Sequence, residues 1–361
     1  MLIFSNPQHA LHRAQHEMFR GRLVPVHEVP ARMDFVLAEL ARRPVGEPQS
    51  PPPVTQAQLE RVHARRYLEF LRTAWSEWVA LDRANADLDA LPSVWPVRGF
   101  RADVEPANFA ARMGLYSFDA GTPLMAGTWT AAEAGAACAV AAAKALRTPG
   151  APRATMALTR PPGHHAGHDF FGGYCFLNNA AIAAQSLLDE GARRVAVLDV
   201  DYHHGNGTQS LFYARADVLT VSIHGDPRTE YPFYLGHADE RGEGEGEGHN
   251  LNLPLPTGTD FSRWHAALST AMQRVADFGP DALVVALGVD TFEGDPISGF
   301  RLESGHYLQV GRDLASMRLP VVFTLEGGYA VEAMGVNVVN VLEGFAVHAG
   351  GQAAGAGTPD W

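Results

Sequence analysis

Residues 195–207 read Val-Ala-Val-Leu-Asp-Val-Asp-Tyr-His-His-Gly-Asn-Gly, and this stretch decides the fold. Its first four residues are all apolar, without the alternation of a half-exposed strand. The runs 282–287 and 321–325 have the same character. Strands of this kind are buried on both faces, as in a parallel sheet covered by helices. Helical patterns lie between them, so we predict one α/β domain over residues 1–361, with a mostly parallel multi-stranded sheet flanked by helices.

The rest of the chain supplies further elements around these strands. Strands are expected over 154–159, 194–200, 217–224, 281–287 and 319–325, with a short strand at the N-terminus. Helices are expected over 55–81, 131–146, 177–190, 262–277, 304–316 and 331–346. The segment 84–128 is irregular and rich in proline, and a loop region of that length usually forms a binding rim or an interface arm. The alternating Gly and Glu of residues 242–248 indicate an exposed, mobile surface turn, with a demanding loop beside the site as the alternative.

Composition and charge exclude several classes of protein. Lys and Arg number 28 against 40 Asp and Glu, a net charge of −12 that disfavours nucleic acid and anionic membranes as partners and favours cationic ones. The two cysteines, Cys138 and Cys175, form no disulfide framework and no cysteine-based zinc site. The sequence has no signal peptide pattern and no apolar run of about 20 residues, so we expect a cytoplasmic protein.

Polar side chains follow four of the predicted strands. The first strand leads into Arg160-Pro-Pro-Gly-His-His165, the second into Asp199–Gly207, the third into Gly288-Val-Asp290 and the fourth into Glu326-Gly-Gly-Tyr329. In open α/β sheets, ligands bind outside the carboxyl ends of the strands. We therefore expect these side chains to meet at one edge of the sheet and to form an active site.

Two acids and one histidine at this edge suit a metal ion. Asp201 and His203 are two residues apart and point to the same side of an extended chain. With Asp290 they make three ligands, which leaves a position open for water or substrate, as a catalytic metal requires. Zinc is the first expectation, and Fe²⁺, Co²⁺ or Mn²⁺ suit the same oxygen-rich set. Asp199 is placed to orient a neighbouring histidine.

The remaining candidates are proton carriers. His164 and His165 offer a general base and an electrostatic partner, because adjacent histidines with different neighbours can carry different pKa values. Tyr329 can donate its phenol proton to a developing oxyanion. A nucleophilic role for Cys175 is conceivable, but a buried packing role is the stronger expectation. The sequence has neither the Gly-x-Ser-x-Gly nucleophile elbow nor a Walker A loop. It also lacks the Gly-x-Gly-x-x-Gly pattern of dinucleotide-binding proteins.

Taken together, these motifs resemble the arginase/deacetylase-fold family of histone deacetylases and acetylpolyamine amidohydrolases. The segments that carry the resemblance are 160–166, 171–179, 199–207, 287–290 and 325–329. Asn206, where others have Asp, resembles the class II and bacterial branch. Leu23-Val-Pro25 and an insertion around 95–128, which ends in Ala-Gly-Thr-Trp129, are most similar to the acetylpolyamine amidohydrolases.

The resemblance implies a role for each matching residue. Asp201, His203 and Asp290 would bind the catalytic zinc. His165 would act as general base and then general acid, with His164 as electrostatic partner and Tyr329 polarising the amide carbonyl. Asp199 would orient His164, and Asn206 would contact His165. A narrow substrate tunnel would be lined by Gly173, Tyr174 and Tyr231. A structural K⁺ is implied near Asp199, Asp201, His203, Ser222 and Ile223, partly through backbone oxygens.

One part of the sequence departs from the polyamine enzymes. Ala110 and Gly121 stand where two acids of those enzymes would read the distal ammonium of the substrate, and Glu105 and Asp119 are the nearby candidates to replace them. In those enzymes the same insertion, here about 84–128, builds a homodimer that narrows the site. The resemblance therefore implies a homodimer as well.

The expected function is metal-dependent hydrolysis of the acetyl amide of N-acetylated polyamines or small acetylated amines, which yields acetate and free amine. The alternatives are a protein acetyl-lysine deacetylase, hydrolysis of another small amide or a guanidino compound, and a non-catalytic module that binds acetylated ligands. The expected partner is a small cationic substrate, with neither nucleic acid nor membrane.

Overall fold

A parallel sheet forms the centre of the computed structural model, which describes residues 1–97, 99–148 and 150–353. Within these residues the main sheet has eight strands in the order β4-β1-β5-β10-β9-β6-β7-β8, and every neighbouring pair is parallel. The predicted α/β class is confirmed. Position 361, the predicted end of the domain, and position 98 of the predicted insertion lie outside the described residues.

The strands are β1 (Leu2–Ser5), β2 (His16–Phe19), β3 (Arg22–Pro25), β4 (Pro48–Gln49), β5 (Ala154–Leu158), β6 (Val195–Asp199), β7 (Val218–Gly225), β8 (Asn250–Leu255), β9 (Ala282–Leu287) and β10 (Val321–Leu325). The helices are α1 (Ala31–Arg42), α2 (Gln56–Leu59), α3 (Arg65–Leu81), α4 (Phe109–Leu115), α5 (Thr128–Ala145), α6 (Asn179–Asp189), α7 (Asn206–Phe212), α8 (Phe261–Phe278), α9 (His306–Ser316) and α10 (Val331–Ala353).

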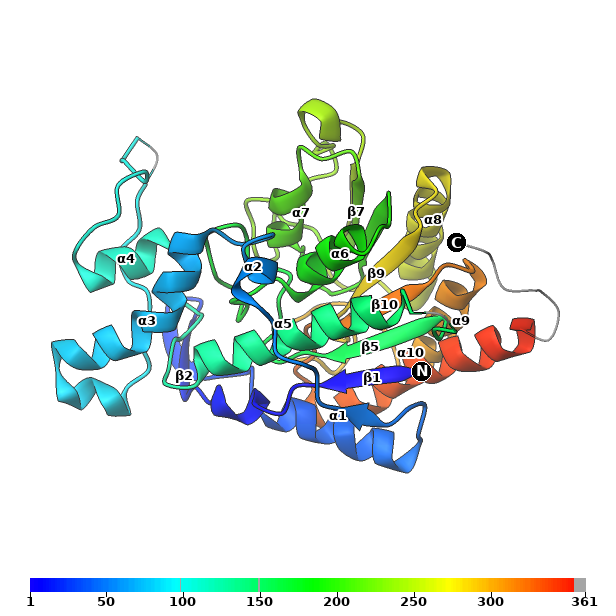
Figure 1. The fold of residues 1–361 in the computed structure, drawn as a ribbon, viewed down its shortest axis with the longest axis horizontal. Helices are drawn as coiled ribbons and strands as arrows, with labels where there is room; N and C mark the ends of the chain where they lie inside the picture. The colour runs from blue at the N-terminus through cyan, green and yellow to red at the C-terminus, as the bar shows by residue number, and fades with distance from the viewer. Residues whose placement is uncertain (98, 149, 354–361) are drawn as a thin grey trace.

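Alternate residues of each strand enter two separate cores. Val195 and Val197 of β6 pack in one core with residues of α3, α5 and α6. Ala196 and Leu198 face the other core, which is shared with α1, α8, α9 and α10. Helices therefore cover both faces of the sheet, and Figure 1 shows α5 and α6 in front of it with α1 and α10 beneath. Burial on both faces explains why these strands are continuously apolar.

The strand order brings the predicted site together. β5, β10, β9 and β6 are consecutive neighbours in the sheet, so their carboxyl ends lie side by side. These are the four strands whose following loops carry the candidate residues. The fold thus places segments that are more than 160 residues apart in sequence, such as those after β5 and β10, at one edge.

Several elements were missed by the sequence analysis. Helix α1 buries the charged residues Arg32 and Glu39 in ion pairs, so its buried face does not appear as an apolar pattern in the sequence. Strand β8 buries Asn250 and Asn252, which made it look like loop. The hairpin of β2 and β3 and the short helix α7 were also not expected. The predicted helix 55–81 is wrong in its middle, because the chain is extended at Ala64 between α2 and α3.

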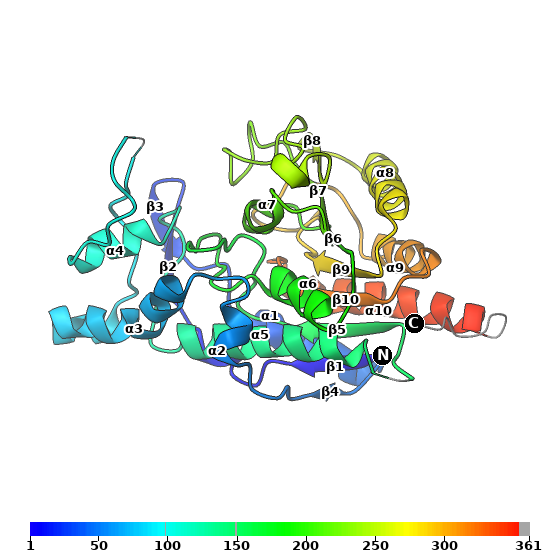
Figure 2. The same ribbon diagram turned by 45° about the horizontal axis from the view of Figure 1, so that its top comes forward.

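The insertion 84–128 is more regular than expected. It contains helix α4, whose N-cap Asn108 accepts a hydrogen bond from the Ala111 N–H at 3.1 Å. Figure 2 shows α4 and the loop before it standing out from the body at the end that also carries the β2–β3 hairpin. Four apolar side chains of this loop are exposed, namely Val94, Val97, Phe100 and Val104.

The Gly-Glu segment 242–248 is partly packed. It includes a short 3₁₀ turn, Gly244–Gly246, and Gly246 is buried against Tyr213. The Glu243 N–H donates to the Tyr213 carbonyl at 2.9 Å. The glutamate side chains remain exposed, as predicted for this segment. None of the helices in the described part of the chain is long and apolar enough to cross a membrane.

Candidate active site

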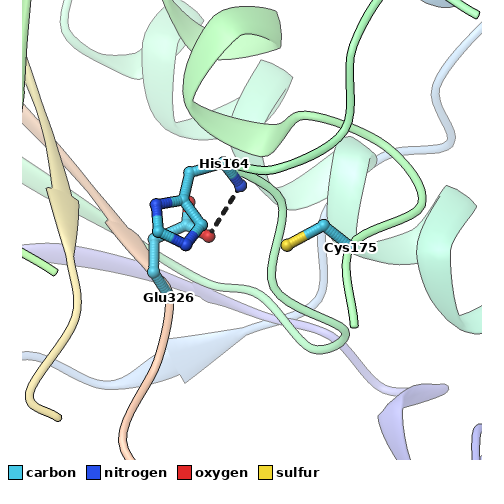
Figure 3. A group of neighbouring side chains, drawn as sticks. All are labelled: His164, Cys175 and Glu326. Atoms are coloured by element: carbon cyan, nitrogen blue, oxygen red, sulfur yellow. Dashed lines mark hydrogen bonds between the residues drawn. The ribbon is translucent and has the colours of Figure 1, made fainter. Parts of the chain in front are cut away.

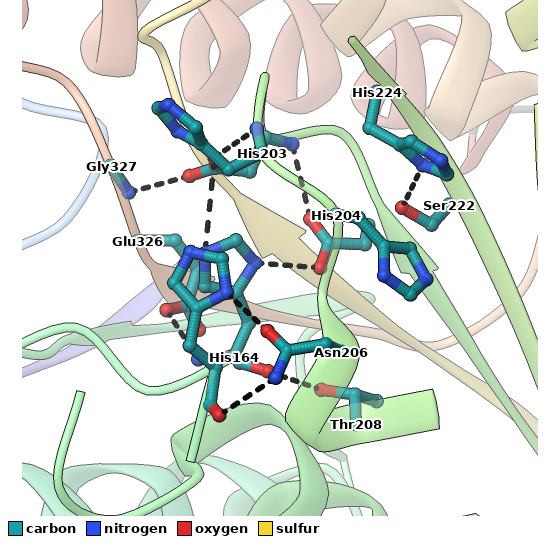
Figure 4. Close-up of polar contacts among 12 residues, drawn as sticks. His164, His203, His204, Asn206, Thr208, Ser222, His224, Glu326 and Gly327 are labelled. Atoms are coloured by element: carbon teal, nitrogen blue, oxygen red, sulfur yellow. Dashed lines mark hydrogen bonds and ion pairs between the residues drawn. The ribbon is translucent and has the colours of Figure 1, made fainter. Parts of the chain in front are cut away.

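The loops after β5, β6, β9 and β10 converge on one buried cluster (Figure 4). Asp201, His203 and Asp290 each offer a ligand atom, and these atoms lie within 4.8 Å of one another. His203 Nδ1 is 2.9 Å from Asp290 Oδ2 and 3.4 Å from Asp201 Oδ1. The predicted ligands are therefore brought together, with Nδ1 as the histidine nitrogen that faces the carboxylates.

The donor set fits a divalent cation. Burial, together with the charge of Asp201, raises the pKa of Asp290 to about 8. Two buried carboxylates side by side need a cation or a shared proton. A divalent cation with an imidazole and two carboxylates as ligands meets that need and is a common catalytic arrangement.

Backbone groups fix the orientation of these carboxylates. Asp201 Oδ2 accepts from the Gly327 N–H at 2.8 Å, and Asp290 Oδ1 accepts from the Tyr202 N–H at 2.8 Å. A Cβ atom at Gly327 would lie 2.6 Å from both carboxylates, so a side chain is excluded there. The glycine after Glu326 lets the β10 loop approach the candidate metal ligands.

The two adjacent histidines have opposite environments. His164 Nδ1 lies 2.8 Å from Asp199 Oδ2, and although burial opposes it, the charges of Asp199 and Asp201 raise the pKa of His164 to about 10. His165 Nδ1 donates to Asn206 Oδ1 at 2.6 Å, which leaves Nε2 free to accept a proton. Burial and the charge on His164 lower the pKa of His165 well below its usual value. At neutral pH, one ring is a fixed cation and the other is a free base.

Tyr329 is held by residues that the sequence analysis missed. Asp295 Oδ2 accepts from the Tyr329 N–H at 2.7 Å and from the Ala330 N–H at 3.2 Å. Arg32 Nε donates to the Gly328 carbonyl at 2.7 Å, and its guanidinium lies 4.9 Å from the centroid of the Tyr329 ring. Asp295 follows Asp290 by five residues in the same loop. This closeness to a candidate ligand was the one feature of the sequence that could have pointed to Asp295 as a site residue.

Glu326 links two of the loops. Its Oε2 accepts from the Gly163 N–H at 2.6 Å. It also accepts from the His164 N–H at 3.1 Å, as Figure 3 shows. Cys175 lies in the same buried group and donates its thiol to the Gly173 carbonyl at 3.2 Å. Burial raises the pKa of the Cys175 thiol well above its usual value, which disfavours the thiolate that a nucleophile needs.

A cavity of about 390 Å³ leads from this cluster to the surface, with His165, His203 and Tyr329 in its lining. Tyr174 and Tyr231, the predicted tunnel walls, also line it: the Tyr231 ring centroid is 5.1 Å from that of His165, and that of Tyr174 is 5.5 Å from that of Tyr329. Gly173 has a φ of +54°, and a Cβ there would lie 2.2 Å from the His165 ring.

The two candidate amine readers differ in position. Asp119 lines the cavity, but its Oδ2 already accepts from the Tyr231 hydroxyl at 2.5 Å and from the Gly173 N–H at 2.7 Å. Glu105 is not among the lining residues; it accepts from the Tyr116 hydroxyl at 2.6 Å. Within one chain, the structure brings only Asp119 to the cavity.

Three charged residues of the lining were not predicted: Glu17, Arg20 and Glu230. Glu17 is buried, and its Oε1 lies 2.7 Å from His27 Nδ1 and accepts from the Tyr174 hydroxyl at 3.0 Å. Glu230 is half-buried and accepts from the Thr257 hydroxyl at 2.7 Å. They were missed because they come from the hairpin and the loop after β7, outside the strand-end motifs.

The residues named for potassium lie on neighbouring elements. Asp199 of β6 is paired in register with Ser222 of β7, and Ile223 follows it. Ser222 Oγ lies 2.7 Å from His224 Nδ1 (Figure 4). Asp201 and His203 follow on the loop after β6.

Known proteins resemble this chain along nearly all of it. The histone deacetylase domain matches residues 26–345. Acetylpolyamine amidohydrolase 1 of Pseudomonas aeruginosa is 52% identical over 96% of this chain and 99% of its own length. Acetylpolyamine amidohydrolase 2 of the same organism is 50% identical over 96% and 98%. The crystal structure of an acetylpolyamine aminohydrolase from Burkholderia pseudomallei has a TM-score of 0.90 at 38% identity and covers 96% of this chain and 99% of that chain.

Proposed function

This chain belongs to the histone deacetylase domain family, and from that premise we propose that it hydrolyses the acetyl amide of N-acetylated polyamines or small acetylated amines. The products are acetate and the free amine. The observation that carries the proposal is the pair of adjacent histidines, one bound to Asp199 and the other to Asn206, beside the cluster of Asp201, His203 and Asp290 at the base of a cavity lined by tyrosines.

Family membership implies a metal ion, and we infer that it is zinc, held by Asp201, His203 and Asp290; Fe²⁺, Co²⁺ or Mn²⁺ would suit the same donors. When bound, such an ion polarises a carbonyl and lowers the pKa of water. A structural K⁺ beside Asp199 and Ser222 belongs to the same proposal.

The protein's own residues carry the proton transfers. His165 Nε2 takes a proton from the attacking water and returns it to the departing amine nitrogen. His164 stays protonated against Asp199 and stabilises negative charge near the acetyl carbon. The Tyr329 hydroxyl donates to the carbonyl oxygen as negative charge develops there. Asp295, bound to the Tyr329 N–H, and Arg32, bound to the Gly328 carbonyl, hold the backbone that positions this hydroxyl.

We also propose a homodimer through the insertion 84–128 and a location in the cytoplasm. Exposed apolar side chains on a protruding loop support the dimer, since such groups mark interaction sites. Glu105 lies in this insertion but does not line the cavity of its own chain. If it binds the distal ammonium, it does so at the cavity of the partner subunit.

The experiment compares two substrates. The metal-loaded chain is expected to have a higher kcat/KM for N-acetylputrescine than for an acetyl-lysine peptide, because a cavity of about 390 Å³ suits a small molecule and its lining includes residues of the insertion and the hairpin. Faster turnover of the peptide by orders of magnitude would favour the protein deacetylase instead. Binding of either substrate without hydrolysis would favour a non-catalytic module.

A further inference from the structure

One arginine lines the substrate cavity. Of the described residues that form its wall, Glu17, Asp119 and Glu230 carry carboxylates, and Arg20 is the one lysine or arginine. A guanidinium at this position opposes the distal ammonium of a polyamine. Its presence calls for a ligand group of the opposite sign.

The turn of the hairpin sets the position of Arg20. The last pair of β2 and β3 joins Phe19 to Arg22, so Arg20 and Gly21 form a two-residue loop. Their φ angles are +49° and +79°. Positive φ at both central residues is the type I′ turn that matches the twist of a hairpin. The backbone therefore holds Arg20 at the tip of the hairpin.

Arg20 is uncommitted, whereas the acids of the cavity have partners. Among the described residues Arg20 makes no ion pair and no side-chain hydrogen bond; its guanidinium lies 5.2 Å from the Phe19 ring centroid. Asp119 accepts from Tyr231 and Gly173 through Oδ2 and from the Gly121 N–H through Oδ1 at 3.0 Å. Glu230 accepts from the Thr257 hydroxyl through Oε1 and lies beside the Tyr202 hydroxyl, and among the described residues no cationic side chain is paired with it.

The lining thus includes both a cation, Arg20, and a carboxylate, Glu230. An arginine pairs with a carboxylate through two parallel hydrogen bonds, and a half-buried carboxylate pairs with an ammonium. An α-amino acid carries a carboxylate and an ammonium on the same carbon. The carboxylate could pair with Arg20 and the ammonium with Glu230. A cavity of about 390 Å³ lies within the size of small-molecule sites, which is roughly 300–1,000 Å³.

We propose that this site also hydrolyses free ω-N-acetylated α,ω-diamino acids, with Arg20 binding the α-carboxylate and Glu230 the α-ammonium. The inference rests on the proposed deacetylase function. The reaction is the same: water adds its oxygen to the acetyl carbon, the carbon–nitrogen bond breaks, and the side-chain amine leaves with a proton from His165. The products are acetate and the diamino acid.

Two matched pairs of substrates isolate the carboxylate. Nδ-acetylornithine differs from N-acetylputrescine, and Nε-acetyllysine from N-acetylcadaverine, by the α-carboxylate alone. The wild type is expected to hydrolyse both members of each pair. Arg20→Gln should lower kcat/KM for the amino acids about fivefold, mainly through KM, because an exposed pair is weak. It should raise kcat/KM for the diamines, because it removes a cation that opposes their distal ammonium.

Arg22→Gln is the control, since Arg22 lies on the same hairpin but outside the cavity lining. It should change neither substrate class. Hydrolysis of the diamines without hydrolysis of the amino acids would overturn this inference and leave the proposed function standing. An equal loss on both classes in Arg20→Gln would also overturn it. Failure on all four substrates would overturn the proposed function itself.

Discussion

In the proposed reaction His165 moves the proton of the attacking water and Tyr329 donates to the carbonyl oxygen. Under the proposed mechanism, in which the Tyr329 hydroxyl donates to the developing oxyanion, Tyr329→Phe should lower kcat by about 100- to 1,000-fold, the range for loss of one such donor. KM should change little, because the phenol contributes mainly in the transition state. Steady-state kinetics on N-acetylputrescine would check this, and turnover near that of the wild type would remove Tyr329 from the mechanism.

Glu326 acts through the backbone of the histidine loop. Removing its acceptor in Glu326→Ala leaves the N–H groups of Gly163 and His164 unpaired, and a shift of the histidines should lower kcat by about 10- to 100-fold. Bound metal and KM should stay as in the wild type. Glu326→Gln keeps one oxygen acceptor and should recover most of the activity. A Gln variant as impaired as the Ala variant would show that charge, not hydrogen bonding, matters there.

The sequence predicted the site unevenly at this scale. The metal ligands, both histidines and Tyr329 directly follow apolar strands, so their position in the pattern pointed to them. Asp295 and Arg32 reach the loop after β10 only through its backbone and the face of the Tyr329 ring. Contacts of that kind depend on tertiary packing between distant segments, and no local pattern records them.

At the scale of elements, His63 joins the break between α2 and α3 to the start of α6. Its Nδ1 donates to the Gly167 carbonyl at 2.7 Å, and its Nε2 accepts from the Asn178 N–H at 3.0 Å, so the ring must be neutral. Burial lowers the pKa of His63 to about 4, from 6.5 in the unfolded chain. The unfolded chain therefore binds the extra proton first as pH falls from 6.5 to 4.

Stability should fall over that window, by about 3 kcal/mol for a histidine shifted this far. His63→Gln, which can still donate and accept, should show a flatter loss of unfolding free energy between pH 6.5 and 4. Denaturant unfolding of both proteins at a series of pH values measures the difference. Parallel curves for the two proteins would mean that His63 does not titrate in this way.

Elements were predictable where burial is purely apolar. β5, β6, β9 and β10 were found within two residues of their ends because both faces contact helices. α1 was not found, since its buried Arg32 pairs with Glu28 and with backbone carbonyls instead of presenting an apolar stripe. The β2–β3 hairpin was missed because its turn is Arg-Gly rather than the usual Asn-Gly.

At the scale of the molecule, the proposed homodimer can be tested at the protruding insertion, which is expected to form its interface. Phe100 is 70% exposed on that loop, and Phe100→Asp should weaken dimerisation by placing a charge in the interface. Val347→Asp is the matched control, since Val347 is 66% exposed on α10, away from the insertion. Light scattering over a dilution series should show monomer appearing at a higher concentration for the first variant only. A monomeric wild type would contradict the proposed dimer.

The central claim is that this cluster of metal ligands and histidines cleaves a small acetylated amine. It is tested most directly by acetate release from N-acetylputrescine, measured for the zinc-loaded wild type and for His165→Ala at equal zinc content. We predict steady release by the wild type and a loss of at least about 100-fold in the variant, as expected for a general base. A wild type that releases no acetate, or a variant that matches it, would contradict the account.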